Sequence, residues 1–254
     1  MSDRLKDRIA RGDLLLGTWV KTPSMMIAEV LTQTPFDLVC LDAEHAPFER
    51  GTLDQCLGVL SLHRFPALVR VPSRAPEHTL NALDCGATGI VVPHVTDSGA
   101  AAAAVRGAHF GPGGRGFAGS TRAAAYTGRP MARHLEDSAA STVVVAQIED
   151  VEGVENIEAI AATDGVDCLF VGRADLTVAL GAPSPQAPEV VAAVERVCRA
   201  GRAAGRPTGM FLGDLEELPR WRELGATLFL LGSDHSCLLA GARQLADRFH
   251  SLAT

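Results

Sequence analysis

The stretch DLVCLDAEHAPF (residues 37–48) joins a short apolar run to a cluster of charged side chains. The four residues before Asp42 are all apolar, which is typical of a strand that is buried on both faces. Asp42, Glu44 and His45 follow at once. In α/β barrels the residues that follow a buried strand build the functional site. The stretch therefore predicts such a fold and marks one edge of its site.

Short apolar runs of this kind recur along the chain and alternate with amphipathic stretches typical of helices. Several of these stretches begin with Ser or Asp or end at Gly, as helices commonly do. Eight strand–helix units in 254 residues predict one (β/α)8 TIM barrel, a single domain spanning residues 1–254. The expected strands are LLLGTWV (14–20), FDLVCLD (36–42), PALVRV (66–71), TGIVVPHV (88–95), TVVVAQIE (142–149), DCLFVGR (167–173), PTGMFL (207–212) and TLFLLGSD (227–234).

Two segments depart from this alternation. Residues 109–140 form an expected insertion between the fourth and fifth strands, and its first part is rich in Gly and Arg. Because loops this long are uncommon in a compact domain, we expect it to be functional or mobile. The Pro-rich segment GAPSPQAP (181–188) is interpreted as a spacer between two helices.

Composition excludes several classes of partner. The formal net charge is −7, and no dense run of Lys and Arg is present, which argues against nucleic-acid binding. The charged N-terminal segment lacks the apolar core of a signal peptide, and no stretch reaches the roughly 18 apolar residues of a membrane span. The six scattered cysteines are typical of small buried side chains in a reducing compartment. We therefore expect a cytoplasmic protein with no membrane partner.

Polar side chains gather at the carboxyl ends of the expected strands, whereas the opposite ends are mostly preceded by Gly, Ala, Thr and Pro. Six different strands contribute, which predicts a functional site at one mouth of the barrel. The residues concerned are Asp42, Glu44, His45, Arg70, His94, Gln147, Glu149, Arg173, Asp175, Ser233 and Asp234.

Glu149 and Asp175 end neighbouring strands and offer two carboxylates. Two carboxylates plus water suit a hard divalent cation such as Mg²⁺ or Mn²⁺. The alternatives are that Asp175 caps the helix that follows it and that Glu149 is an ordinary surface acid.

The remaining polar residues at the mouth allow proton transfer and anion binding. His45 is suited to proton transfer near neutral pH, although it could equally be a solvated loop histidine. Arg70 lies in an otherwise apolar run, so its guanidinium needs a carboxylate partner or an anionic ligand. Asp42 would orient His45 or cap the turn, and Glu44 would pair with an arginine at the mouth. The small residues of GRAD (172–175) would let a carboxylate approach a helix start.

Several motifs, in this order and spacing, resemble the HpcH/HpaI family of class II pyruvate aldolases over roughly residues 14 to 235. They are LDAEHAPF, RVP at 70–72, ALDCGATGIVVPHV, GPGGRG, QIE and FVGRADL. The resemblance implies a metal-dependent barrel enzyme that cleaves 4-hydroxy-2-oxo acids into pyruvate and an aldehyde, or runs the reverse condensation. It also implies a homo-oligomer, commonly a hexamer, with the C-terminal helix exchanged between subunits.

Matched residue by residue, the resemblance implies specific roles for the candidate side chains. Glu149 and Asp175 would bind Mg²⁺, Mn²⁺ or Co²⁺, and Arg70 would stabilise the enolate oxygen. His45 would transfer a proton, with Asp42 nearby and Asp84 as its orienting partner. The substrate-binding residues would be Gln147, Gly172, Arg173, Ala174 and Leu212, the last on the aldehyde side.

One position departs from the family pattern, and alternatives to an aldolase stay open. Many members have Pro where this chain has Arg173, which would place a cation beside the substrate or form an ion pair with a neighbouring acid. A Schiff-base mechanism is not expected, because neither Lys6 nor Lys21 ends a late strand. The alternatives are a citrate-lyase-like or malyl-CoA-lyase-like thioester lyase, a decarboxylase, and a non-catalytic carboxylate-binding barrel.

Overall fold

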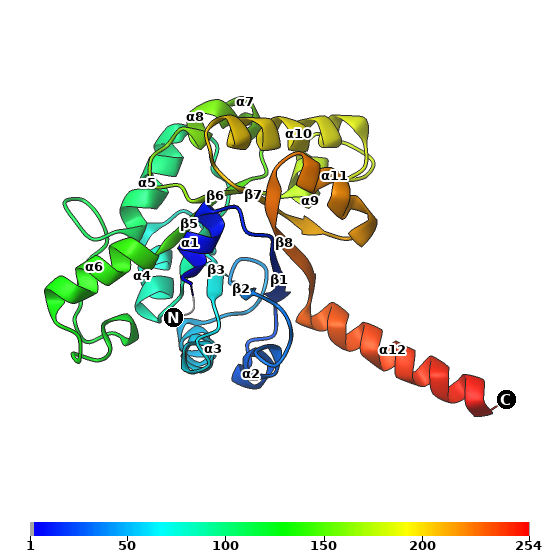
Figure 1. Ribbon diagram of the computed structural model, residues 1–254, viewed down its shortest axis with the longest axis horizontal. Coiled ribbons are helices and arrows are strands. Elements are labelled where there is room, and N and C mark those ends of the chain that lie inside the picture. The colour runs from blue at the N-terminus through cyan, green and yellow to red at the C-terminus, as the bar shows by residue number, and fades with distance from the viewer. Residues whose placement is uncertain (1–2, 254) are drawn as a thin grey trace.

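The computed structural model describes residues 3–253, in which eight parallel strands close into a barrel in sequence order. Helices surround the strands (Figure 1). The predicted (β/α)8 fold is therefore confirmed. The strands are β1 (Leu15–Val20), β2 (Leu38–Asp42), β3 (Ala67–Arg70), β4 (Gly89–Val92), β5 (Val143–Ile148), β6 (Cys168–Val171), β7 (Thr208–Leu212) and β8 (Ala226–Ser233).

The helices follow the expected alternation, with two refinements. In the first, the segment after β5 forms two short helices that meet at Asn156 in place of a single helix. The helices are α1 (Leu5–Ala10), α2 (Met25–Leu31), α3 (Arg50–Leu62), α4 (Pro76–Asp84), α5 (Ser98–Ala108), α6 (Met131–Ser141), α7 (Val151–Glu155), α8 (Ile157–Ala161), α9 (Arg173–Ala179), α10 (Pro188–Ala203), α11 (Leu218–Glu223) and α12 (Asp234–Ala253), with 3-10 turns η1 (Arg122–Ala124) and η2 (Leu215–Glu217).

The second refinement concerns the segment predicted to be an insertion. Residues 109–130 are irregular apart from η1, whereas the rest of the segment belongs to the helix α6. Arg122 anchors the irregular part to α3 through a two-pronged ion pair with Asp54, at 2.7 and 3.2 Å. The irregular part is therefore held against the outside of the barrel. The division of the chain into domains stays a prediction.

Side chains alternate between the inside of the barrel and the layer beneath the helices. In β2, Leu38 and Cys40 belong to the inner cluster, whereas Val39 and Leu41 pack in the outer one. Two residues of α1, Leu5 and Ile9, join the inner cluster and close one end of the barrel. Because successive side chains of a strand point to opposite faces, this alternation fixes which polar residues reach the interior at the other end.

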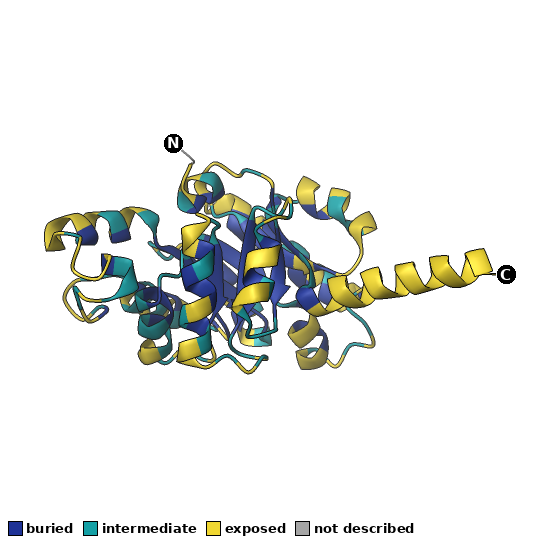
Figure 2. Ribbon diagram, turned by 90° about the horizontal axis from the view of Figure 1, so that it is seen from below, coloured by how far each residue is buried: buried dark blue, intermediate teal, exposed yellow. Residues whose placement is uncertain are grey.

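The helix α12 leaves the barrel and projects into solvent (Figure 1). Its surface is exposed along nearly its whole length (Figure 2). Large apolar side chains lie on it, including Leu238, Leu245 and Phe249, which are 71%, 72% and 68% exposed. Within residues 3–253, no helix is both long and apolar enough to cross a membrane.

Gly89 provides a test of how tightly the strands pack. A Cβ atom at this position would lie 2.6 Å from the Cβ of Val143 in the neighbouring strand β5. We expect Gly89→Ala to lower the free energy of unfolding by about 1–3 kcal/mol, measured by urea denaturation. Gly107→Ala is the matched control, since no atom would meet its new methyl within 4 Å and α5 would gain helix propensity. Equal stability of the two variants would contradict the packing argument.

Candidate functional site

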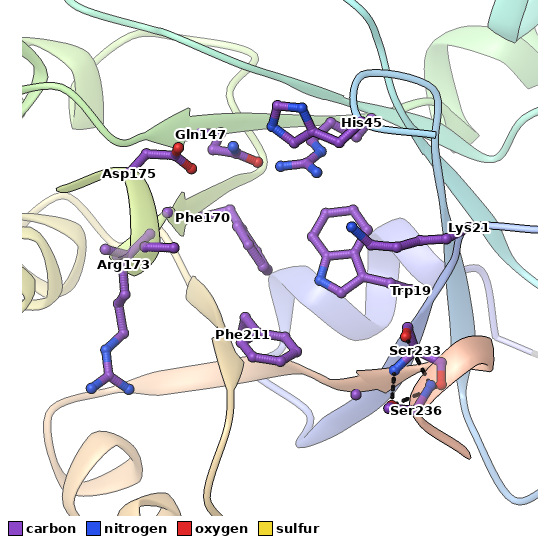
Figure 3. A pocket seen from close by; sticks show the side chains of 15 residues that line it. Trp19, Lys21, His45, Gln147, Phe170, Arg173, Asp175, Phe211, Ser233 and Ser236 are labelled. Atoms are coloured by element: carbon purple, nitrogen blue, oxygen red, sulfur yellow. Dashed lines mark hydrogen bonds between the residues drawn. The ribbon is translucent and has the colours of Figure 1, made fainter. Parts of the chain in front are cut away.

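A cavity of about 400 Å³ opens at the carboxyl ends of the strands (Figure 3). Trp19 and Lys21 line it from the end of β1, and Phe211 lines it from β7. Most of the predicted site residues also border this cavity. The lining residues are Trp19, Lys21, His45, Arg70, Gln147, Phe170, Val171, Gly172, Arg173, Ala174, Asp175, Phe211, Gly232, Ser233 and Ser236.

A buried ion pair between Asp42 and Arg70 forms the floor of this region. The two residues lie opposite each other in the register of β2 and β3. Each lies two residues after an inward-pointing side chain, Cys40 or Leu68, so both point into the barrel. The Arg70 guanidinium donates from Nε and Nη2 to the two Asp42 carboxylate oxygens, at 3.0 and 2.8 Å. The indole of Trp19 lies against the guanidinium, 4.4 Å from ring centre to Cζ. The arginine is thereby fixed with a defined orientation.

Asp42 remains ionised despite complete burial of its side chain. Burial raises the pKa of this carboxyl, but the hydrogen bonds and charge of Arg70 outweigh that effect and leave the pKa below its ordinary value. Lys21 Nζ lies 3.0 Å from Asp42 Oδ2 and adds a second cation. Lys21, which the sequence analysis considered only as a Schiff-base candidate, therefore lies at the site as an ion-pair partner.

His45 lies at the carboxyl ends of the strands, whereas Asp84 lies at the opposite end of the barrel. The backbone N–H of His45 donates to Asp42 Oδ1 at 3.1 Å, whereas its imidazole is 55% exposed at the mouth. Asp42 thus positions the loop and not the ring. Asp84 is the last residue of α4, which runs back toward the amino ends of the strands, and it lines an outer hollow with Arg50 and Arg122. Within one chain the structure does not bring Asp84 to His45.

Glu149 is 2% exposed and lies just beyond β5, with the same inward parity as Gln147. Its carboxylate accepts hydrogen bonds from the side-chain amide of Gln147 and, at 2.8 Å, from the backbone N–H of His94. Burial raises the pKa of Glu149; these two hydrogen bonds oppose the rise, and the charge of Asp175 adds to it. The negative charges of Glu149 and Asp175 therefore act on each other.

The absence of a side chain at residue 172 makes room for this carboxylate. A Cβ atom on Gly172 would lie 2.7 Å from both Cβ and Oε2 of Glu149. Gly172 immediately precedes α9, whose first turn carries Asp175. The close approach of β5 and the start of α9 therefore depends on glycine at this position.

Glu44 and His94 complete a group that could hold a metal ion together with Glu149. Their ligand atoms all lie within 4.8 Å of one another. His94 Nδ1 is 3.5 Å from Glu149 Oε1 and 3.0 Å from Asp150 Oδ2. Glu44 also approaches Arg70 Nε at 3.3 Å, which is the arginine contact considered for it in the sequence. Both residues were predicted to lie at the mouth, and no ligand role was predicted for either.

The imidazole of His94 is held among carboxylates. Partial burial lowers the pKa of His94, but the hydrogen bond to Asp150 and the charges of Glu149 and Glu44 more than offset this and raise it. The backbone of His94 is left-handed, with a φ of 53°. This conformation aims its N–H at Glu149, so a local strain is part of how the carboxylate is held.

The side chain of Arg173 turns away from the cavity (Figure 3). It forms an ion pair with Glu217, with 3.0 Å between Nη2 and Oε1, and its guanidinium lies 5.2 Å from the Trp221 ring centre. Of the two alternatives for Arg173, the structure shows the ion pair. Arg173 and Ala174 both border the cavity.

Leu212 does not border the cavity, whereas its neighbour Phe211 does. Leu212 is 1% exposed and packs in the outer cluster with Met210, so its side chain faces the helices. The run PTGMFL shows no regular polar and apolar alternation from which the inward residue can be identified. Trp19 and Phe211 were missed for the same reason, although a tryptophan near the end of the first run was a usable signal. Lys21 directly follows that run, and this position was the signal that could have placed it at the mouth.

Comparisons with known proteins agree with one another. Residues 15–240 match the model of the HpcH/HpaI aldolase/citrate lyase family. The chain is 33% identical to a hydroxypyruvate/pyruvate aldolase of Pseudomonas aeruginosa, over 97% of this chain and 92% of that protein. It is also 33% identical to a 4-hydroxy-2-oxo-heptane-1,7-dioate aldolase of Klebsiella pneumoniae, over 100% and 96%. A crystal structure of a HpcH/HpaI aldolase/citrate lyase family protein from Burkholderia cenocepacia superposes with a TM-score of 0.90 at 38% identity, over 97% and 98% of the two chains.

The ion pair beneath the cavity can be tested through stability. We expect Asp42→Ala to lower the free energy of unfolding by about 3–5 kcal/mol, because it leaves the buried Arg70 cation without its main partner. The double variant Asp42→Ala/Arg70→Met should recover much of that loss, since it removes both charges. Urea denaturation measures both effects. The single variant Arg70→Met is measured as well. If the loss in the free energy of unfolding of the double variant equals the sum of the losses of the two single variants, the two residues act independently, which would contradict the argument.

Proposed function

The chain belongs to the HpcH/HpaI aldolase/citrate lyase family, and from this we propose that it is a divalent-metal-dependent pyruvate aldolase. It would cleave 4-hydroxy-2-oxo acids to pyruvate and an aldehyde, or form them in the reverse direction. The observation that carries the proposal is that Asp175 and the anchored Arg70 guanidinium line one cavity, while the buried Glu149 carboxylate lies directly behind its wall, against Gln147 and Gly172.

The residues around Glu149 suit a bound cation. The buried Glu149 carboxylate is destabilised in its charged form by burial and by the charge of Asp175, and a divalent cation would relieve both effects. Carboxylate oxygens suit Mg²⁺ and Mn²⁺, whereas a neighbouring imidazole such as His94 favours Mn²⁺ or Co²⁺. We propose Glu149 and Asp175 as the ligands, with Glu44 and His94 adjoining them.

Pyruvate would be oriented by the chain's own groups around the cation site. A bound divalent cation supplies Lewis-acid polarisation of the keto group of pyruvate. Gln147 Oε1 is buried without a hydrogen-bond partner among the described residues, which supports a ligand-facing role for this side chain. Residues Gly172 to Asp175 also border the cavity, and their backbone would receive the carboxylate.

Arg70 and His45 would carry the charge and proton changes of the reaction. Negative charge develops on the keto oxygen as the enolate forms, and a guanidinium already fixed by Asp42 stabilises it without reorganising. His45 stands at the exposed mouth, where its imidazole can exchange a proton with the aldehyde-derived hydroxyl or with water. Asp84 as an orienting partner of His45 would have to come from another subunit.

The alternatives differ in what they require of the substrate. A citrate-lyase-like or malyl-CoA-lyase-like enzyme would use the same cation and arginine on a thioester, and a non-catalytic barrel would bind a carboxylate without turnover. Both are distinguished from the aldolase by a reaction that needs only pyruvate and metal.

Exchange of the pyruvate methyl protons is the first test. The protein, stripped of metal with a chelator, is incubated with pyruvate in D₂O, and the methyl signal is followed by NMR after adding Mg²⁺, Mn²⁺ or Co²⁺. We expect exchange that depends on metal and falls by at least about 100-fold in Glu149→Gln and in Arg70→Ala. Glu158→Gln makes the same chemical change at an exposed surface position and should leave exchange unchanged.

Two outcomes would contradict the proposal. Absence of exchange with every metal would favour the thioester lyase or the binding protein. Exchange that persists without metal, together with trapping of pyruvate on Lys21 by borohydride, would replace the metal mechanism with a Schiff-base mechanism, because Lys21 borders the cavity.

We also propose that the chain assembles into a homo-oligomer, as expected from the family, with α12 packed on a neighbouring subunit. The helix makes few contacts with its own barrel and exposes Leu238, Leu239, Leu245, Phe249 and Leu252. A helix this apolar and this exposed is typical of an interaction surface. Cytoplasmic localisation is part of the same proposal and is supported by six cysteines that are all free.

Substitutions on α12 test the assembly. We expect Leu245→Glu/Phe249→Glu to shift the protein to smaller species in sedimentation velocity, because charges would be buried in the interface. Gln244→Glu on the same helix is the control and should retain the assembly of the unmodified chain. A monomeric unmodified chain would contradict the proposal directly.

A further inference from the structure

A second hollow, of about 330 Å³, lies at the opposite end of the barrel from the candidate active site. Thr88 and Thr142, which precede β4 and β5, line its inner side. At about 3.3 Å per residue, the six residues of β5 separate it from the cavity mouth by roughly 20 Å. The hollow is therefore separate from the substrate cavity, and no role has been given to it so far.

The lining of this hollow is strongly cationic. Three arginines, Arg115, Arg122 and Arg129, border it together with His134 and several hydroxyl groups. None of the described residues that line it is an aspartate or a glutamate. A concave surface of one charge sign attracts ligands of the opposite sign, so the expected ligand is an anion.

Arg115 is the most informative of these side chains. It is 7% exposed, and no ion pair involves it within residues 3–253. Its Nη2 donates to Ser138 Oγ at 3.3 Å, its guanidinium stacks 3.9 Å from the Phe110 ring centre, and its Nε has no hydrogen-bond partner. Burial lowers the pKa of Arg115 to about 10, so the group stays charged at neutral pH. The charge of Asp84 also acts on Arg115, but no hydrogen bond or ion pair joins these two side chains within residues 3–253. A buried cation without a directly bound carboxylate is costly unless an anion binds it.

Further donors face the same space. His134 is 3% exposed, and its Nδ1 has no hydrogen-bond partner in the described chain. Arg129 makes only long contacts, since its Nη1 donates to the carbonyl oxygen of Ala123 at 3.4 Å and lies 3.7 Å from Asp137 Oδ2. The hydroxyls of Ser138 and Thr142 lie 3.4 Å apart. By contrast, Arg122 already donates to Asp54, so it contributes positive charge to the hollow but is not counted among its main donors.

We propose that this hollow binds a phosphate group, supplied by inorganic phosphate or by a small phosphomonoester, with Arg115, Arg129 and His134 as its main donors. Guanidinium groups match the oxygens of phosphate in pairs, and charge-assisted hydrogen bonds of this type are strong. Imidazole and hydroxyl donors approaching from other directions suit a tetrahedral oxyanion with more than two acceptor oxygens. The site stands independently of the aldolase proposal.

Calorimetric titration tests the site on the full-length protein without added metal. The ligands are inorganic phosphate and glycerol 3-phosphate, with sodium chloride at matched ionic strength as the reference. We expect one site per chain for at least one phosphate ligand, confirmed by broadening of its ³¹P NMR signal. Tighter binding of glycerol 3-phosphate identifies a phosphomonoester, whereas tighter or equal binding of inorganic phosphate identifies the free ion.

Variants decide whether the binding occurs in this hollow. Arg115→Met and Arg129→Met should each weaken phosphate binding by at least about tenfold. Arg202→Gln, which removes an exposed cation on α10, should leave it unchanged. If the buried Arg115 variant fails to fold, the more exposed Arg129 variant decides. Binding no stronger than that of chloride, or equal binding by the Arg129 variant and the unmodified chain, would overturn the proposal.

Discussion

The ion pair between Asp42 and Arg70 is the constraint on which the rest of the site depends. A fully buried carboxylate and a nearly buried guanidinium can share the barrel interior only because they are register partners and bind through two hydrogen bonds. Asp42 also accepts from the His45 backbone and pairs with Lys21. One aspartate therefore sets the positions of the Arg70 guanidinium, the His45 loop and the only lysine at the mouth among the described residues.

The site's two charge centres are arranged by different physical means. On one side, Arg70 is held by a partner of opposite charge. On the other, Glu149 is held by neutral donors, the Gln147 amide and the His94 backbone, and the His94 imidazole lies 3.5 Å away. Among the described residues, no Lys or Arg pairs with this carboxylate, so it is suited to receive a cation, whereas an arginine already paired with Asp42 is suited to receive a transient negative charge. The separation of these roles agrees with a reaction that builds charge on one oxygen between them.

Much of the fold could be predicted from the sequence, because eight continuous apolar runs are the direct signature of a parallel barrel. The polar residues that end those runs had to lie at one mouth, so Arg70, Gln147 and Glu149 were identifiable as a group. Side-chain direction was not identifiable where a run shows no regular polar and apolar alternation, which is why Phe211 borders the cavity in place of Leu212. Two features could not be predicted from the sequence. One is contact between distant segments, such as the ion pair of Arg173 with Glu217. The other is the direction of α4, which carries Asp84 away from His45.

The left-handed backbone at His94 lowers the stability of the folded protein. For a residue with a Cβ atom, this conformation is unfavourable by about 1–2 kcal/mol, and glycine would adopt it freely. Yet glycine would lack the imidazole that lies between Glu44, Glu149 and Asp150. Selection for a more stable barrel and selection for this ring therefore act in opposite directions at one position. A screen for thermal stability alone would tend to remove the ring, so variants obtained in that way should be checked at residue 94 before their chemistry is interpreted.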